Sequence, residues 1–247
     1  MPVVISLYDY TGAMVKPWAK AGFECYCFDL LHEKWHTQKV KGGGCIHFVH
    51  ADLHSLKNLQ KIAASFDGAD VAFVAGFPVC THLAVSGAAH FARKRREDPA
   101  FQTKAAQHAK NVQAFVEMLD VETPPPFCIE NPVSVLSTLW RKPNFTFHPY
   151  EYGQYIPAKE AVHPLWSKYI APRDAYTKKT CLWTGNGFKM PEKRPVAIPQ
   201  RKPGQRSKQM MLSGNHKDTK TIRSATPRGF AQAVFEANSG RMASRRV

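Results

Sequence analysis

The chain has 247 residues, of which 44% are hydrophobic and 21% are charged. That length allows one large domain with a substantial core, and the composition excludes a disordered or low-complexity protein. The formal net charge is +15, and it is unevenly distributed. Residues 189–247 hold 14 Lys and Arg against 3 Asp and Glu, a net of +11, which leaves +4 for the first 188 residues. This asymmetry favours a polyanionic partner such as nucleic acid or a nucleotide phosphate.

Membrane and secretory classes do not fit the sequence. No apolar run approaches the roughly 18 residues needed to span a bilayer. The first residues, MPVVISLYDYTG, lack the charged leader and cleavage site of a signal peptide, so we expect a cytoplasmic location. The cysteines at positions 25, 27, 45, 80, 128 and 181 form no CxxC pair, and we expect no disulfide framework in that compartment.

Short apolar runs alternate with helical segments through the first half of the chain. This pattern predicts strands at residues 3–8, 23–28, 45–49, 71–75 and 127–129, with helices at 56–63 and 101–119. Strands that alternate with helices imply a mostly parallel α/β sheet whose ligands gather at the carboxyl ends of the strands. Polar segments follow these ends: Asp9, Asp29, Asp52, residues 76–80 and Glu130. Loops are commonly polar, but five such ends favour a site.

The second half of the chain has a different composition. Residues 143–223 are rich in Pro, Gly and Lys, with few periodic segments, which predicts irregular strands and loops that face a substrate. We expect a helix at 227–238 to close the fold, with Thr226 as its N-cap. The predicted division is a catalytic core (1–142), a small basic and aromatic substrate-recognition region (143–223), the closing helix (224–240) and a flexible basic tail (241–247).

Two residues are candidates for covalent chemistry. Cys80 lies in the turn GFPVCTHL directly after a predicted buried strand, a position that suits an exposed thiolate nucleophile. The alternative is a small buried hydrophobic residue. Glu130 follows the apolar run PFCI, and a carboxylic acid in such surroundings can donate a proton to a ring nitrogen. Its alternative is a surface carboxylate that caps a loop.

These motifs, in this order, resemble the C5-cytosine-specific DNA methyltransferase family. Its members combine a glycine-containing first loop, a Pro-Cys nucleophile loop and a Glu-Asn motif, matched here by DYTG, GFPVCTHLAVSG and IENP. The compact phage-encoded members, with PPCTHL-type and ENP motifs and a PRGFA-type closing helix, are more similar still. The likeness covers most of the chain. It implies a Rossmann-like class I S-adenosylmethionine-dependent methyltransferase fold with a small irregular substrate-facing region.

The resemblance also implies roles for individual residues. Cys80 would add to C6 of cytosine while Glu130 protonates N3, so that C5 can take the sulfonium methyl group. Thr81, His82 and Asn131 would lie beside the substrate. Asp29 would bind the ribose hydroxyls of S-adenosylmethionine, and Asp52 would bind its adenine amine. The full expected set of cofactor-binding residues is Asp9, Tyr10, Thr11, Gly12, Asp29, Asp52 and Pro78.

The sequence departs from the family pattern in several places. Val79, Thr81 and Pro132 stand where relatives have Pro, Gln and Val, and no Gln-x-Arg-x-Arg segment holds the cytosine O2. We hypothesise that the cytosine O2 is held instead by Lys178, Lys179 and Thr180, with Trp183. Because 247 residues leave little room for a target-recognition domain, a cytosine nucleotide, or DNA read with little specificity, fits the length at least as well as sequence-specific reading of duplex DNA.

Two further clusters have alternative interpretations. Cys25, Cys27 and Cys45 lie near five histidines between positions 32 and 54, but without ordinary zinc spacing, so we expect core cysteines, surface histidines and no metal. The aromatic residues either stack on nucleic-acid bases or form an inward face of a strand; they are Phe145, Phe147, Tyr150, Tyr152 and Tyr155.

The leading hypothesis is C5-methylation of cytosine in DNA through a covalent cysteine adduct. Modification of a free cytosine nucleotide, or transfer of another one-carbon group, uses the same chemistry. A non-catalytic nucleic-acid-binding relative is the alternative from a different class. The pairing of Cys80 with Glu130 favours an enzyme, because a binder needs neither group. Target sequence, strandedness and oligomeric state are not encoded in these motifs.

Overall fold

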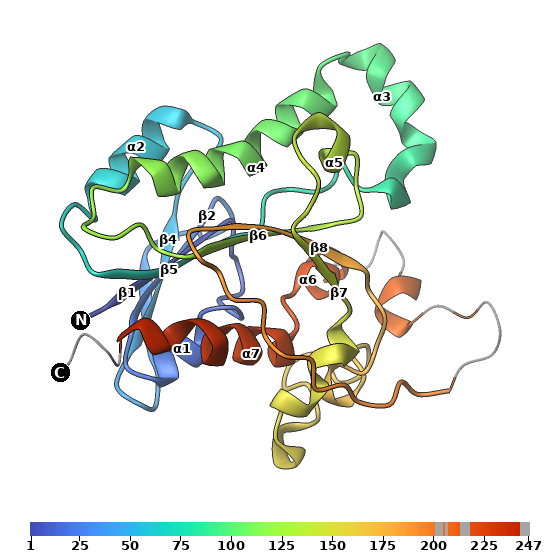
Figure 1. Ribbon diagram of the computed structural model, residues 1–247. Coiled ribbons are helices and arrows are strands. Elements are labelled where there is room, and N and C mark those ends of the chain that lie inside the picture. Colours follow the sequence, from blue (N-terminus) through green and yellow to red (C-terminus); the bar gives the residue numbers. More distant parts are fainter. Residues whose placement is uncertain (201–204, 206, 213–217, 243–247) are drawn as a thin grey trace.

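The computed structural model describes residues 1–200, 205, 207–212 and 218–242. Within these residues one mixed sheet has the order β3-β4-β2-β1-β5-β6-β8-β7 (Figure 1). Five neighbouring strands are parallel, whereas β3 is antiparallel to β4, and β8 is antiparallel to both β6 and β7. The strands are β1 (Val3–Leu7), β2 (Glu24–Asp29), β3 (His36–Lys39), β4 (Cys45–His50), β5 (Val71–Gly76), β6 (Phe127–Pro132), β7 (Phe145–Phe147) and β8 (Thr180–Gly185).

Helices cover both faces of this sheet (Figure 1). On one face lie α2 (Leu56–Ala64), α4 (Phe101–Met118) and α5 (Leu136–Leu139), and on the other lie α1 (Lys16–Lys20) and α7 (Arg228–Asn238). Near the carboxyl ends of the strands are α3 (Phe91–Glu97) and α6 (Thr219–Ser224). The 3-10 helices are η1 (Val85–His90), η2 (Pro149–Tyr155), η3 (Ala158–Glu160), η4 (Pro172–Asp174), η5 (Lys208–Met211) and η6 (Ser239–Met242).

The strand order confirms the expected Rossmann-like α/β fold. From β1 the chain first adds β2 and β4 on one side and then returns to add β5 and β6 on the other. In such sheets ligands bind outside the carboxyl ends, where the strand order reverses. The loops that follow β1 and β5 therefore border the expected binding crevice.

Packing of α4 on the sheet fixes the start of the nucleophile loop. The buried face of α4 is made of small and apolar side chains, among them Ala105, Ala109 and Val112. Gly76, the last residue of β5, lies directly beneath this face, where an added Cβ would be 2.6 Å from Val112 Cγ1. A side chain at position 76 would push α4 away from the sheet, because cores packed this closely do not absorb an extra carbon freely.

Several elements differ from those predicted. β6 continues through Glu130 to Pro132, so Glu130 lies within a strand, because antiparallel pairing with β8 extends it. The edge strand β3 and the segment η1–α3 have no strong apolar periodicity, and the sequence analysis missed them. The irregular region 143–223 supplies two strands, β7 and β8, to the main sheet.

The closing helix is confirmed, but its predicted cap is wrong. The N-cap is Pro227, with φ −60° and ψ 129°, and no side chain caps the helix. A residue before proline is disfavoured in the helical region, and Thr226 lies outside the helix. The helix therefore begins at Arg228, one residue later than the proposed cap allows.

Two general features follow from the described residues. None of their helices combines the length and apolar character that a membrane span requires. All six cysteines are free thiols, and four of them, Cys25, Cys27, Cys128 and Cys181, are buried in the core. The predicted tail residues 243–247 lie outside the described residues.

Candidate active site at the carboxyl edge of the sheet

The loop after β1 is organised by the carboxylate of Asp9. Its Oδ1 accepts hydrogen bonds from the backbone amides of Gly12 (2.8 Å) and Thr11 (3.1 Å), and its Oδ2 accepts one from the Ser6 hydroxyl (2.8 Å). Gly12 has a φ of +64°, a conformation that suits glycine. Asp9 is 4% exposed, and burial raises the pKa of its carboxyl. Both oxygens are thus used to shape the loop, which leaves Tyr10 at its exposed tip.

A histidine that the sequence analysis placed on the surface supports this loop. His32 is buried, because its ring lies between Tyr10, at a centroid distance of 5.4 Å, and Phe48, at 5.3 Å. Its Nε2 lies 3.3 Å from the Asp9 carbonyl oxygen, a distance suited to an N–H donor. Burial lowers the pKa of His32. The expectation of surface histidines is wrong at this position.

The two other acidic strand ends differ from Asp9. Asp29 ends β2 and is half-buried, with its Oδ1 accepting the Leu31 amide at 2.8 Å. Asp52 follows β4, is exposed, and accepts the His54 amide at 2.9 Å. Each has a second carboxylate oxygen with no hydrogen bond to the described residues. Exposed Leu30 lies beside Asp29 and adds an apolar surface to the same edge.

The nucleophile loop is tied to the strand that holds Glu130. Asn131 donates from Nδ2 to the Pro78 carbonyl oxygen at 3.0 Å, two residues before Cys80. An isolated bridge joins Ala84 to Ser134 on the far side of the cysteine. The Oδ1 atom of Asn131 is buried and has no hydrogen-bond partner within the described structure. The loop that carries Cys80 is therefore joined to β6 at two points, and the Asn131 Oδ1 beside it is a buried acceptor without a donor among the described residues.

Cys80 and Glu130 lie within electrostatic range of each other. Glu130 is 7% exposed, and its Oε1 is 3.8 Å from the ammonium nitrogen of Lys178. Burial, followed by the Glu130 charge, raises the pKa of the Cys80 thiol, whereas Lys178 and Arg223 oppose the rise. The thiol is half-buried, in contrast to the exposed position that the sequence predicts. Cys80, Glu130 and Lys178 share one environment.

The neighbours of Lys178 occupy other environments. Lys179 is exposed and lies near His148 and Cys181, whose ionisation it influences. Thr180 is buried and donates to the Lys178 carbonyl oxygen at 3.0 Å, so it supports the lysine backbone. Trp183 is buried in the core, where its Nε1 donates to the Arg141 carbonyl oxygen. Of the four residues hypothesised to hold the cytosine O2, Lys178 is the one placed beside Glu130.

Residues after the cysteine point toward α3 and α4. Thr81 is exposed, and His82 packs edge-on against Phe101 of α4 at a centroid distance of 5.7 Å. The nitrogen of Lys94 on α3 lies 3.2 Å from His82 Nδ1. Arg223 on α6 is a group that sequence reasoning missed, since it lies 143 positions from Cys80 and no motif contains it.

The aromatic and histidine clusters resolve largely into packing. Phe147 stacks on Phe230 at 3.8 Å, and Tyr152 is buried, so both pack inward, whereas Phe145 is 37% exposed. Tyr155 is partly exposed and donates from its hydroxyl to the Glu192 carbonyl oxygen. Within the described part of the chain, no group of three or more His, Cys, Asp or Glu side chains is placed to hold a metal ion.

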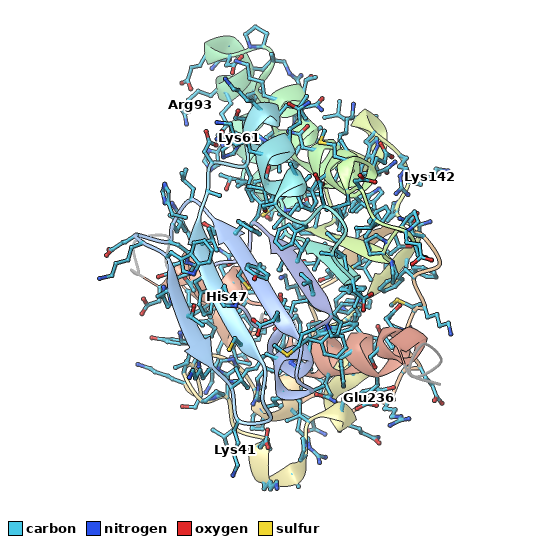
Figure 2. All side chains as sticks on the ribbon, turned by 90° about the vertical axis from the view of Figure 1, so that its left-hand side faces the viewer. Lys41, His47, Lys61, Arg93, Lys142 and Glu236 are labelled. Carbon is cyan, nitrogen blue, oxygen red and sulfur yellow. The ribbon has the colours of Figure 1, made fainter. Side chains whose placement is uncertain are left out.

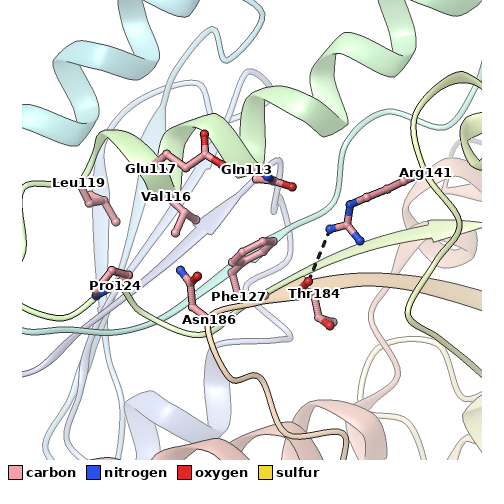
Figure 3. A pocket seen from close by; sticks show the side chains of 10 residues that line it. Gln113, Val116, Glu117, Leu119, Pro124, Phe127, Arg141, Thr184 and Asn186 are labelled. Atoms are coloured by element: carbon pink, nitrogen blue, oxygen red, sulfur yellow. Dashed lines mark hydrogen bonds between the residues drawn. The ribbon is translucent and has the colours of Figure 1, made fainter.

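Two pockets differ in their relation to these residues. The pocket in Figure 3, of about 370 Å³, is lined by Phe127 at the start of β6 and Gly185 at the end of β8, away from Cys80. The second, of about 490 Å³, lies beside the nucleophile loop and is lined by Val79, His82, His54 and residues of α3 and α4. Only the second borders the candidate site.

Comparisons with known proteins give a distant likeness. No family model matches the chain, and no curated protein sequence matches it. A solved structure from E. coli, provisionally described as a DNA modification methyltransferase encoded within a prophage, is 15% identical, with a TM-score of 0.44. The match covers 80% of this chain and 53% of the solved chain, so the present chain spans about half the length of that structure.

Proposed function

We propose that this chain is an S-adenosylmethionine-dependent methyltransferase that acts on C5 of cytosine in DNA. The observation that carries the proposal is the shared environment of Cys80, Glu130 and Lys178 at the carboxyl edge of the sheet. A thiol nucleophile and a buried carboxyl group suit a reaction in which a pyrimidine ring is attacked and protonated together.

Each side chain has a specific task in this reaction. Cys80 gives up its thiol proton to solvent and forms a bond from its sulfur to C6 of cytosine. Glu130 delivers a proton to N3, so that electron density collects at C5, and takes that proton back when the cysteine leaves. Lys178 offsets the negative charge near Glu130 and would hold the carbonyl oxygen O2 of cytosine. After methyl transfer, loss of the C5 proton restores the double bond and expels the Cys80 thiolate.

The first-loop residues fit a cofactor with a nucleoside and a charged amino-acid end. Asp9 acts indirectly by holding the loop, whereas Tyr10, Thr11 and Gly12 border the crevice. Asp29 and Asp52 each offer an unused carboxylate oxygen, which suits hydroxyl and amine donors. S-adenosylmethionine would supply the methyl group as an electrophile. Pro78, in the loop that carries Cys80, completes the proposed cofactor set.

Trapping with 5-fluorocytosine tests the chemistry, because fluorine at C5 cannot leave as a proton and the adduct persists. With S-adenosylmethionine and an oligonucleotide that contains 5-fluorocytosine, we expect a covalent complex visible by mass spectrometry. Cys80→Ala should abolish it, and Cys45→Ala, which removes a half-buried thiol on β4, should not.

Two outcomes would contradict this function. Salt-sensitive DNA binding without an adduct would support the non-catalytic alternative. Calorimetry that detects binding of neither S-adenosylmethionine nor S-adenosylhomocysteine would exclude the proposed cofactor. An adduct with 5-fluoro-dCMP as fast as with the oligonucleotide would instead identify a free nucleotide as the substrate.

A further inference from the structure

The segment from residue 85 to residue 97 contributes no buried residue to the core. Neither η1 nor α3 contains a buried residue, whereas α4, which begins four residues later, buries eight. Figure 1 shows α3 standing off the sheet beyond the end of α4. Phe91 at the start of α3 packs against Phe101 of α4 at a centroid distance of 5.8 Å, and the basic side chains that follow it remain available to a partner.

The charge on this segment is strongly positive. Arg93, Lys94, Arg95 and Arg96 are consecutive and are followed by two acidic residues, Glu97 and Asp98, of which Asp98 pairs with Lys104 at 2.8 Å. Arg93 pairs with Glu97 at 2.6 Å. Lys94, Arg95 and Arg96 have no carboxylate within ion-pair distance among residues that the structure describes; Arg95 donates to the side-chain oxygen of Gln102 at 3.2 Å. Three cations therefore remain uncompensated on an exposed helix.

The basic helix is joined to the nucleophile loop. Lys94 contacts His82 at 3.2 Å, and His82 follows Cys80 by two residues. The pocket of about 490 Å³ lies between them, with Val79 at the loop side and Arg93, Lys94 and Lys104 at the helix side. A ligand held by α3 would therefore act on the position of the loop that carries Cys80.

We propose that residues 85–97 form a phosphate-binding arm that holds the sugar–phosphate backbone of a nucleic-acid strand whose target base enters the Cys80 site. This inference rests on the proposed function and specifies its substrate as a polynucleotide. A mononucleotide has its phosphate close to the reacting base and needs no arm that extends away from the sheet. A strand carries one charge at each nucleotide, and cations outside the site can hold the phosphates that flank the target.

The test compares two double variants with the wild-type protein. Arg95→Gln/Arg96→Gln removes two uncompensated cations and leaves the Lys94–His82 contact intact. Lys39→Gln/Lys41→Gln removes two exposed lysines at and beside β3; Lys41 lies at the opposite end of the molecule from Arg93 in Figure 2. The probe is an oligonucleotide that contains 5-fluorocytosine, with affinity followed by fluorescence anisotropy from low to moderate salt.

We expect the α3 variant to lose roughly 10- to 100-fold in affinity at low salt and the slope of log K against log salt to decrease by about 1 to 2. The β3 variant should match the wild type. Adduct formation with the oligonucleotide should slow only in the α3 variant at subsaturating DNA, and 5-fluoro-dCMP should react poorly with all three proteins.

If the two variants bind the oligonucleotide with equal affinity and equal salt dependence, the proposal that residues 85–97 bind phosphates is wrong. Reaction of 5-fluoro-dCMP as fast as the oligonucleotide would overturn the polynucleotide assignment. Failure of the proposed function is distinguishable, since it removes the adduct from every protein while the anisotropy comparison still decides whether α3 binds phosphates.

Discussion

At the carboxyl ends of β1, β2 and β4, acidic side chains accept hydrogen bonds from amides two or three residues away. Around β5, β6 and β8, by contrast, a buried carboxylate faces a lysine 48 positions later in the chain, and an asparagine reaches back 53 positions to Pro78. The first region is built from local turns, and the second from pairings between distant segments. We therefore expect the geometry of the first region to survive small changes, whereas the geometry of the second region depends on a few long-range contacts.

The largest expected effect is loss of the proposed proton donor. Glu130→Gln keeps the shape of the side chain but cannot protonate N3, and we expect the rate of methyl transfer to DNA to fall roughly 10²- to 10⁴-fold. Glu117→Gln, in the pocket of Figure 3, should leave the rate unchanged. Initial rates with a labelled methyl donor measure both, and an unimpaired Glu130→Gln protein would remove Glu130 from the mechanism.

Adjacent lysines provide the next comparison. Lys178→Met leaves Glu130 without its cationic neighbour and removes a charge that lowers the pKa of Cys80. We expect methyl transfer to fall roughly 10²-fold and thiol alkylation of Cys80 to shift to higher pH. Lys179→Met should change neither quantity. A larger loss in Lys179→Met would reverse the assignment of these two residues.

Packing at the boundary of the two regions has a smaller effect. In Gly76→Ala the new Cβ meets Val112 of α4, and we expect the free energy of unfolding to decrease by about 1 to 3 kcal/mol. Gly87→Ala, whose Cβ would have no neighbour closer than 3.9 Å, should be nearly neutral. Urea denaturation of the two variants decides this, and equal stability would show that α4 moves freely.

The smallest expected effect comes from a pair of histidines, His54 and His108, in the region of β1, β2 and β4. His54 Nδ1 lies 2.8 Å from His108 Nε2, and burial, followed by His54, lowers the pKa of His108 to about 4. Because the unfolded pKa is about 6.5, the neutral ring stabilises the fold above that pH, and the contribution is lost as pH falls toward 4. After allowance for solvent screening of a half-exposed group, we expect about 1 kcal/mol.

His108→Gln isolates this contribution. Between pH 7 and pH 4.5 the wild-type protein should lose more unfolding free energy than the variant, measured by urea denaturation at each pH. Histidines that do not contact His108 have the same surroundings in both proteins, so their contributions cancel in the difference. Parallel pH profiles would show that His108 titrates alike in the folded and unfolded states.

The parts of the fold that the sequence predicted have strong local periodicity. The apolar runs of β1, β2, β4 and β5 and the helical repeats of α2, α4 and α7 were recognisable because each buries one face or both. β3 has no buried residue, and η1–α3 has none either. A segment without a buried face produces no apolar pattern, which is why these elements were missed.

The candidate site divides in the same way. Cys80 and Glu130 were identifiable because each follows or ends an apolar run. The sequence could not show which of Lys178 and Lys179 lies beside Glu130. Alternate residues near β8 point in opposite directions, and the register of β8 against β6 depends on the folded sheet. Arg223 had no local signal, because α6 reaches the site only through tertiary packing. The inward packing of Phe147 depends likewise on Phe230.

The antiparallel insertion of β8 has a consequence for synthesis of the protein. β8 separates β6 from β7, and the segment before it carries Lys178, so the strand that holds Glu130 has no neighbour on that side until residues 180–185 have left the ribosome. Arg223 follows later still. A nascent chain could therefore form the first-loop region well before its thiol meets both cations, and reactivity would arise only at the end of translation.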